Sequence, residues 1–212
     1  MGTTLALSLR MNAGTKARKP NLDSLREQAR DCRACDLWRR ATQTVFGEGP
    51  ARAQAMLVGE QPGDAEDLQG HPFVGPAGAL LDRALVDAGL DRNKLYVTNA
   101  VKHFKWEPRG KRRLHKTPAQ QEIEACHRWL EEEIAILHPR LIVCLGATAA
   151  RAVTGRPVKV GDSRGNIVEL EAGPALLFTV HPSFVLRVPG DARKHAYDAL
   201  VADLKVAADY LD

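Results

Sequence analysis

The stretch at residues 59–78 constrains the fold of this chain more than any other segment. It contains five glycines, three prolines and four acids. The apolar run before it, 55–58, predicts a buried strand, and residues 79–85 after it predict an amphipathic helix. A strand–helix connection usually takes about 2–6 residues, so this one is too long for a plain connector. Open α/β sheets bind ligands where strands end, and the stretch is therefore predicted to be a binding loop.

The rest of the chain repeats this alternation of strand and helix. Further strands are predicted at 94–101, 141–146 and 175–180. Helices are predicted at 22–40 (broken in its second half), 79–89, 117–138, 147–154 and 191–210, with a β-excursion at 158–171. This order predicts an α/β protein, a three-layer α/β/α sandwich around a central, mostly parallel sheet. We expect one domain at 21–212, preceded by a disordered basic leader at 1–20.

Composition excludes some classes of protein. The chain has 212 residues, of which 44% are hydrophobic, enough for one domain with a full core. No apolar run approaches the roughly 18–20 residues that span a membrane. We expect a cytoplasmic monomer. The net charge of +4 permits a nucleic-acid partner without requiring one.

Four cysteines form a candidate metal site. Cys32 and Cys35 make a C-x2-C pair, whereas Cys126 and Cys144 are single. Thiolates in this arrangement bind either zinc or an iron–sulfur cluster, and the spacing does not choose between them. The alternative is that the cysteines are simply buried, since free cysteine commonly is.

A basic segment carries the first candidate reactive group. His115 stands among Lys111, Arg112, Arg113 and Lys116. Neighbouring cations lower the pKa of a histidine, and a neutral imidazole is a nucleophile or a base. The alternative is a solvated loop that at most contacts phosphate.

His181 is the second candidate, because it ends a predicted strand before Pro182. An imidazole there could donate to a developing oxyanion, or it could be a capped core histidine. Three segments, 59–78, 99–117 and 181–187, follow strand carboxyl ends and are expected to converge on one crevice.

Taken together, these motifs resemble the iron–sulfur branch of the uracil-DNA glycosylase superfamily. The resemblance covers nearly everything from residue 22 onward. Its motifs are Gly-Glu-Gln-Pro-Gly at 59–63, Pro-Phe-Val-Gly-Pro-Ala-Gly at 72–78, Val-Thr-Asn-Ala-Val-Lys at 97–102 and His-Pro-Ser at 181–183. The resemblance implies a [4Fe-4S] cluster held by Cys32, Cys35, Cys126 and Cys144.

Within that branch the chain looks like the UdgX-type subgroup. Lys-Arg-Arg-Leu-His at 111–115 is similar to the insert that distinguishes it, with Leu114 in place of isoleucine. Phe184 and Val185 depart from the small or aliphatic residues usual in the last motif. The subgroup implies that His115 attacks C1′ of deoxyribose after uracil leaves, so that the protein stays attached to DNA.

The resemblance also implies roles for the other site residues. Phe73 would stack under a flipped uracil and Asn99 would read its edge. His181 would stabilise charge on O2 and Glu60 would orient His115. Three residues of the first loop would shape the substrate pocket: Gln61, Gly63 and Asp64. Six residues would contact the DNA backbone: Lys111, Arg112, Arg113, Lys116, Ser183 and Arg187.

Two other functions remain open at this point. The first is a turnover glycosylase in which the basic segment only binds DNA. The second is a non-catalytic binder of uracil-containing DNA. Single strands are the expected preference, because flipping a base costs least there, and duplex DNA remains open as a partner. A phosphate-binding enzyme fits poorly, since the glycine-rich loop has neither the P-loop ending nor G-x-G-x-x-G.

Overall fold

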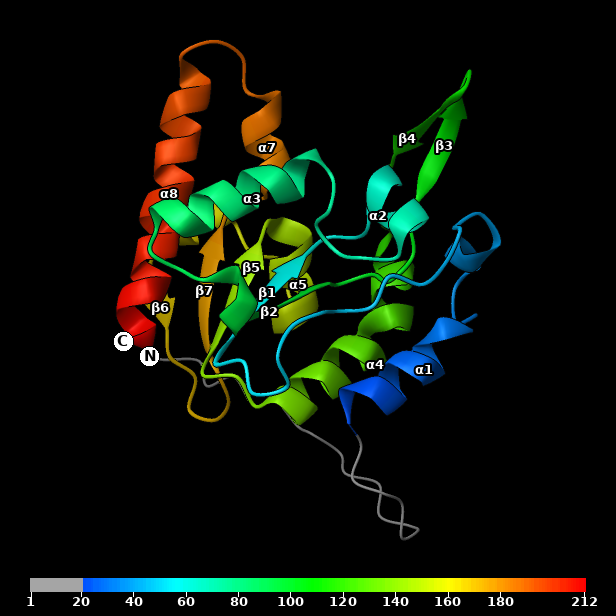
Figure 1. Ribbon diagram of the computed structural model, residues 1–212, viewed down its shortest axis with the longest axis horizontal. Coiled ribbons are helices and arrows are strands. Elements are labelled where there is room, and N and C mark those ends of the chain that lie inside the picture. The colour runs from blue at the N-terminus through cyan, green and yellow to red at the C-terminus, as the bar shows by residue number, and fades with distance from the viewer. Residues whose placement is uncertain (1–20) are drawn as a thin grey trace, which may run out of the picture.

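A computed structural model describes residues 21–212, and the predicted leader at 1–20 lies outside them (Figure 1). The central sheet has the strand order β2-β1-β5-β7-β6. Its strands are β1 (Ala55–Gly59), β2 (Leu95–Asn99), β5 (Leu141–Leu145), β6 (Ile167–Val168) and β7 (Ala175–Thr179). All neighbouring pairs are parallel except β6 with β7. The predicted mostly parallel sheet is confirmed.

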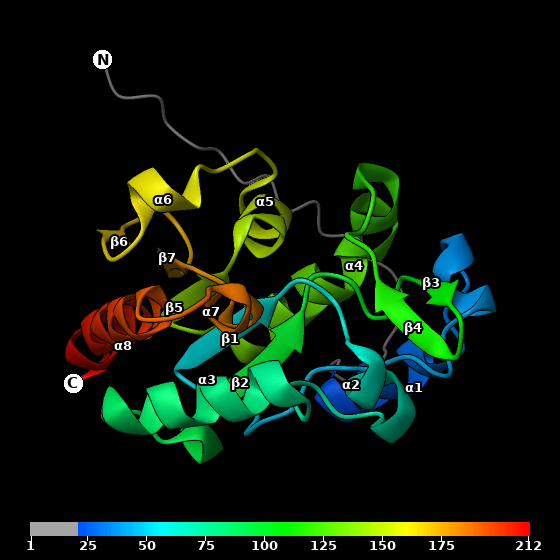
Figure 2. The same cartoon turned by 90° about the horizontal axis from the view of Figure 1, so that it is seen from above.

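Helices cover both faces of the sheet (Figure 2). One face packs on α4 (Gln120–Leu137) and α5 (Ala147–Thr154), with α1 (Leu22–Arg30) against α4. The other packs on α3 (Pro76–Asp87), α7 (Pro182–Arg187) and α8 (Ala192–Leu211). Every residue of the four parallel strands is buried, as expected of strands covered on both faces. This is why they read as continuous apolar runs.

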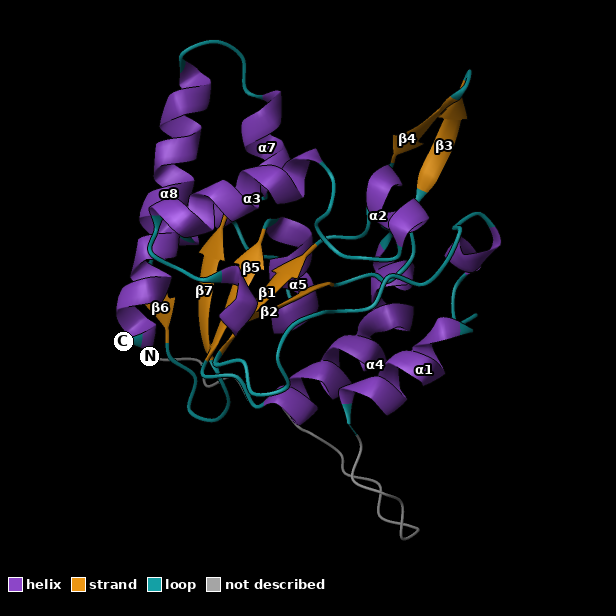
Figure 3. Cartoon of the chain, viewed as in Figure 1, coloured by secondary structure: helices purple, strands orange, loops and turns teal. Residues whose placement is uncertain are grey.

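The segment at 102–116 differs from the prediction of an irregular loop. It contains a hairpin of β3 (Trp106–Arg109) and β4 (Arg112–His115), joined by a turn at 110–111. Figure 3 shows the hairpin standing apart from the central sheet. Its residues are mostly exposed and polar, and Pro108 lies within β3. The hairpin therefore lacks the apolar alternation by which a strand is recognised in a sequence.

Two other predicted loops contain short helices. The glycine-rich stretch includes α2 (Asp64–Gln69), whose start is capped because the Gly63 N–H donates to Glu66. The segment after β7 is α7, which has His181 as its N-cap and Pro182 in its first turn. Both helices have six residues, too short for helical periodicity to reveal in a sequence.

Several predicted boundaries also move. The helix predicted at 117–138 begins at Gln120 with Ala119 as its N-cap, where the Glu122 carboxylate accepts from the Ala119 N–H at 2.6 Å. The helix predicted at 22–40 is α1 followed by a separate 3₁₀ turn. The remaining short elements are η1 (Asp36–Arg39), η2 (Arg92–Lys94) and α6 (Val160–Ser163). In the described part of the chain, no helix combines the length and the apolar character needed to cross a membrane.

Candidate functional site

The candidate site lies at the carboxyl edge of the parallel sheet. Gly59 pairs with Asn99 across β1 and β2, and Leu145 pairs with Thr179 across β5 and β7, so the four strands end together. The three predicted segments meet there around an open cavity of about 700 Å³. Its lining includes Gln61, Gly63, Asp64, Glu66, Phe73, Asn99, Leu114, His115, His181, Ser183 and Arg187. The convergence predicted from the sequence is confirmed.

Asn99 and Phe73 form the buried inner wall. The Oδ1 atom of Asn99 is buried and has no hydrogen-bond partner among the described residues. A Cβ atom at Gly59 would lie 2.3 Å from that Oδ1 and 2.6 Å from the Phe73 ring, so only glycine fits there. Phe73 has a φ of 58°, an uncommon conformation for an aromatic residue. The wall thus presents one unsatisfied acceptor beside a fixed aromatic ring, and such an acceptor suits a ligand N–H.

His181 lies next to this wall as a neutral donor. Its ring stacks on Phe73 with centroids 5.9 Å apart. Its Nδ1 accepts from the Ser183 N–H at 3.1 Å, which leaves the proton on Nε2. Burial, with smaller contributions from His115 and Arg187, lowers the pKa of His181 to about 4. A neutral imidazole with its N–H directed away from Ser183 can donate to an oxyanion.

His115 lines the same cavity, and Glu60 lies beside it. The Nε2 of His115, at the end of β4, is 3.4 Å from Oε1 of Glu60, which follows β1. Burial lowers the pKa of His115. The negative charge of Glu60 raises that pKa in part, and the positive charge of Arg187 lowers it further. His115 is therefore mostly neutral at pH 7. A neutral imidazole beside a carboxylate is the arrangement of an activated nucleophile or base.

Gln61 connects the glycine-rich loop to the hairpin. Its Nε2 donates to the carbonyls of Lys105 (3.2 Å) and Lys116 (3.1 Å), and its Oε1 accepts from the Lys105 N–H at 3.1 Å. Lys105 and Lys116 flank the hairpin on either side. The side chain was expected to shape the substrate pocket. Although it borders the cavity, its amide is occupied in holding the hairpin that carries His115.

Replacing Gln61 by leucine should therefore loosen the hairpin. The variant leaves the Lys116 carbonyl and the Lys105 N–H without a partner, at a cost of about 1 kcal/mol or more for each, while the Lys105 carbonyl keeps its bond from the Lys116 N–H at 3.0 Å. We expect amide hydrogen exchange across residues 106–115 to accelerate by about tenfold or more. Mass spectrometry of deuterium uptake measures this effect.

Gln43 provides the matched control for that experiment, because its amide donates to the carbonyls of Asp67 and Leu68 in α2. Gln43→Leu should leave exchange across 106–115 unchanged. Equal protection of the hairpin in wild type and Gln61→Leu would contradict the assignment.

The cations of the basic segment divide into two groups. Lys111 and Arg112 are exposed at the hairpin tip. Arg113 was expected to contact DNA, but it bonds Asp64 and Asp67 at 2.5 and 2.6 Å and ties the hairpin to α2. This bond also engages Asp64, which was expected to bind substrate.

Three further residues that were expected to contact the DNA backbone lie elsewhere around the site. Lys116 forms a half-exposed ion pair with Glu107. The Ser183 hydroxyl contacts His181 and accepts from Arg187 at 3.1 Å. Arg187 itself lines the cavity.

The predicted set of four cysteine ligands is not assembled as expected. Burial raises the pKa of Cys126 to about 12, and Cys32 and Cys35 add to the shift, so these three thiols are neighbours. Burial alone raises the pKa of Cys144, which lies in the middle of the sheet beside Val58. Within the described residues, no group of three or more His, Cys, Asp or Glu side chains has the arrangement of a metal site.

One buried histidine near the three thiols was missed by the sequence analysis. The Lys102 N–H donates to the Cys126 sulfur at 3.2 Å, and His103 is the next residue. The Nε2 of His103 is 2.9 Å from the Thr44 hydroxyl, which donates to the Arg30 carbonyl, two residues before Cys32. The imidazole is thus linked to both segments that carry the thiols.

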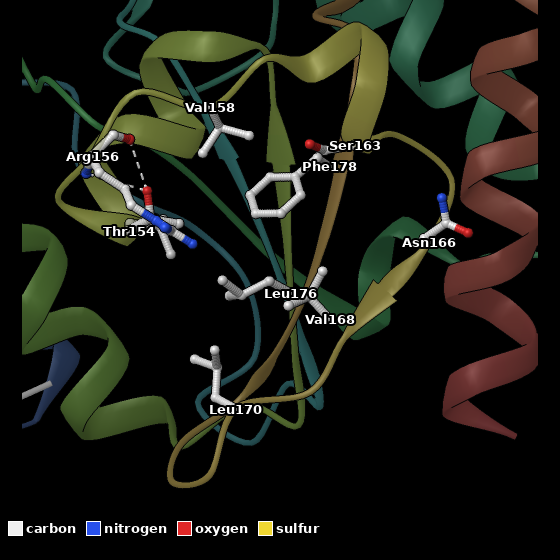
Figure 4. A pocket seen from close by; sticks show the side chains of 10 residues that line it. Thr154, Arg156, Val158, Ser163, Asn166, Val168, Leu170, Leu176 and Phe178 are labelled. Carbon is white, nitrogen blue, oxygen red and sulfur yellow. Dashed lines mark hydrogen bonds between the residues drawn. The ribbon is translucent and has the colours of Figure 1, made fainter. Parts of the chain in front are cut away.

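A second cavity, of about 300 Å³, lies between α5, α6, β6 and β7 (Figure 4). Its walls are mainly aliphatic, with Phe178 at the centre, and a hydrogen bond joins Thr154 to the Arg156 carbonyl. As the structure describes it, the lining contains no imidazole, carboxylate or thiol. This cavity therefore offers no candidate catalytic group.

The sequence matches the family model described as the uracil DNA glycosylase superfamily over residues 46–205. The chain belongs to this superfamily. The matched segment contains all of the cavity lining, whereas Cys32 and Cys35 precede it.

Curated relatives agree with this family assignment. A type-4 uracil-DNA glycosylase of Thermotoga maritima is 38% identical over 171 residues, which cover 80% of this chain and 85% of the relative. A type-4 enzyme of Pyrobaculum aerophilum is 38% identical over 176 residues, with coverage of 80% and 86%. A type-5 enzyme of the same organism is 30% identical over 184 residues, with coverage of 79% and 77%. These names do not distinguish a turnover enzyme from a self-trapping one.

Proposed function

We propose that this protein excises uracil from DNA and then becomes covalently joined, through His115, to C1′ of the deoxyribose. Membership of the uracil-DNA glycosylase superfamily supports the excision step. One observation supports the covalent step. His115, a largely neutral imidazole beside Glu60, faces the same cavity as Asn99 and His181.

Recognition would begin with uracil leaving the base stack and entering the cavity. Phe73 offers its ring as the stacking surface. The unsatisfied Oδ1 of Asn99 would accept from the uracil N3–H, and the amide NH₂ would donate to O4. Cytosine presents an acceptor at N3 and a donor at N4. Its acceptor would face the Oδ1 of Asn99 and its donor would face the amide NH₂, so neither hydrogen bond could form. The single buried amide would therefore discriminate between the two bases.

Bond cleavage would place negative charge on uracil O2 as the C1′–N1 electron pair moves to the base. The Nε2–H of His181 would donate to that oxygen. The deoxyribose would become an oxocarbenium ion at C1′. A ring nitrogen of His115 would then supply its lone pair to C1′, and the other ring N–H would pass its proton to Glu60. The product would be a neutral N-alkylated imidazole and a uracil anion, which takes a proton from water.

DNA would be held across the cavity mouth by the cations that remain exposed. Lys111 and Arg112 at the hairpin tip, and Arg187 at the cavity, are placed to contact phosphates, which position a strand without specifying its sequence. We propose single-stranded DNA as the preferred substrate, because flipping a base from a duplex also breaks its pair.

A denaturing gel tests the proposal. The protein is mixed with a labelled oligonucleotide that contains one uracil, and the mixture is heated in detergent before electrophoresis. A retarded band that survives this treatment is expected, together with stoichiometric release of uracil. Released uracil with no such band would overturn covalent capture and leave a turnover glycosylase. A retained strand with an intact glycosidic bond would indicate a non-catalytic binder.

An iron–sulfur cluster is a further part of the proposal. Three neighbouring thiols, Cys32, Cys35 and Cys126, suit a [4Fe-4S] cluster, and the buried His103 would be the fourth ligand in place of Cys144. The chemistry the cluster supplies when bound is structural: it would join the chain after α1 to α4. The reaction proposed above has no redox step, so none of its steps passes through the cluster.

Iron and acid-labile sulfide content test this ligand set. Cys126→Ser and His103→Ala should lose most of the iron relative to wild type. Cys144→Ser should retain it, because that thiol lies within the sheet. Loss of iron from Cys144→Ser, with retention in His103→Ala, would reverse the assignment.

A further inference from the structure

Thr148 has no role in the reaction proposed above, but it contacts Glu60, which does. Its hydroxyl donates to Oε2 of Glu60 at 2.6 Å, while Oε1 of the same carboxylate lies 3.4 Å from His115 Nε2. The two oxygens of Glu60 thus have separate partners. Thr148 is the one hydrogen-bond donor to this carboxylate among the residues that the structure describes.

The sheet order explains this contact between residues 88 positions apart. Strand β5 lies beside β1 in parallel register, with Cys144 opposite Val58. Glu60 follows β1, and Thr148 lies in the first turn of α5, just after β5. The turn between β5 and α5 is made by Gly146 at a φ of 92°. A short, tight connection therefore brings the hydroxyl to the neighbouring strand's carboxylate.

We propose that Thr148 is a positioning residue for the covalent step, acting through Glu60 to hold His115 in line with C1′. This inference rests on the proposed function. A carboxylate on a flexible side chain has several rotamers, and a bond to one oxygen restricts them. With Oε2 fixed, Oε1 faces the imidazole and is placed to take its proton. Small errors in the alignment of reacting groups reduce rates strongly, by up to about 10²-fold for 1 Å.

The electrostatic surroundings of His115 agree with this geometry. Glu60 and Glu66 act to raise the pKa of His115, whereas burial and Arg187 lower it. His181, which also faces His115, is neutral above about pH 5, because its pKa is about 4. Without the hydroxyl of Thr148, Glu60 is free to turn away, and the pKa of His115 should fall further. This change is measurable in the free protein, without DNA.

Two substitutions at this position separate positioning from packing. Thr148→Val replaces the hydroxyl by a methyl group in a side chain of the same shape, and Thr148→Ser keeps the hydroxyl. The control for the helix itself is Thr154→Val, because Thr154 bonds the Ala150 and Arg156 carbonyls at the far end of α5. All are prepared as the full chain with its cluster, and their iron content is compared.

The first measurement counts adducts per uracil released, on a single-stranded oligonucleotide with one uracil. In Thr148→Val the adduct should form about 10- to 100-fold more slowly, with free abasic DNA appearing in its place. Thr148→Ser and Thr154→Val should resemble wild type. The second measurement is the pKa of His115 by NMR of ¹⁵N-histidine-labelled protein, which should decrease in Thr148→Val alone.

The outcomes distinguish this inference from the proposed function. If wild type forms no adduct, covalent capture fails, and Thr148 loses its role in that step. If wild type forms the adduct and Thr148→Val forms it equally fast with an unchanged His115 pKa, only the role of Thr148 is overturned. Equal slowing in Thr148→Val and Thr148→Ser would also overturn it, because packing rather than the hydroxyl would then matter.

Discussion

His115→Ala should abolish the heat-stable complex with uracil-containing DNA, while uracil continues to be released. Alanine has no lone pair to offer C1′, and the oxocarbenium ion would then be captured by water. In the proposed reaction, departure of uracil depends on Asn99, Phe73 and His181, which line the same cavity as His115. The variant should therefore act as a turnover glycosylase that leaves an alkali-labile site. Gel retardation and a count of uracil released per protein molecule measure the two effects.

A matched histidine is available for comparison with that variant. His127 lies partly exposed on α4 and pairs with Glu131 four residues on. His127→Ala should form the adduct at the wild-type rate. A heat-stable complex in His115→Ala would show that another residue is the nucleophile. Loss of uracil release in the same variant would show that the histidine is needed for cleavage as well as for capture.

His181→Ala should slow uracil excision itself, by about 10²- to 10³-fold, as loss of one oxyanion donor does in other enzymes. Formation of the covalent adduct should slow in parallel, because capture follows cleavage. The pKa of His181 is about 4, so its imidazole is already neutral at pH 5 and remains so at pH 8. The effect of the substitution should accordingly be the same at both pH values. Single-turnover release of labelled uracil gives the rate.

His181→Gln is the informative partner of the alanine variant, since its side-chain amide keeps an N–H donor of similar reach. We expect it to recover part of the lost rate. An excision rate in His181→Ala within tenfold of the wild-type rate would indicate that other groups stabilise the charge on O2. Together, the substitutions at 115 and 181 should separate capture from cleavage.

Much of the framework could be predicted from the sequence because its physical signals are local. The four parallel strands are buried on both faces, so each is a continuous apolar run. Each run is followed by residues of the site, since parallel strands in such a sheet end at the same edge. The hairpin of β3 and β4 was not predicted, because its strands are exposed and polar and lack an apolar pattern.

Local patterns in the sequence are enough to identify the strands of the sheet and the segments that meet at its edge, since burial and strand direction follow from them. The pairing of the side chains at that edge depends on the three-dimensional arrangement. It assigns Gln61 to the hairpin, Arg113 to two acids of α2 and Thr148 to Glu60. It also places Cys144 within the sheet, opposite Val58 and Phe178. These contacts join residues far apart in the chain, and they depend on which strands are neighbours, which no local pattern encodes.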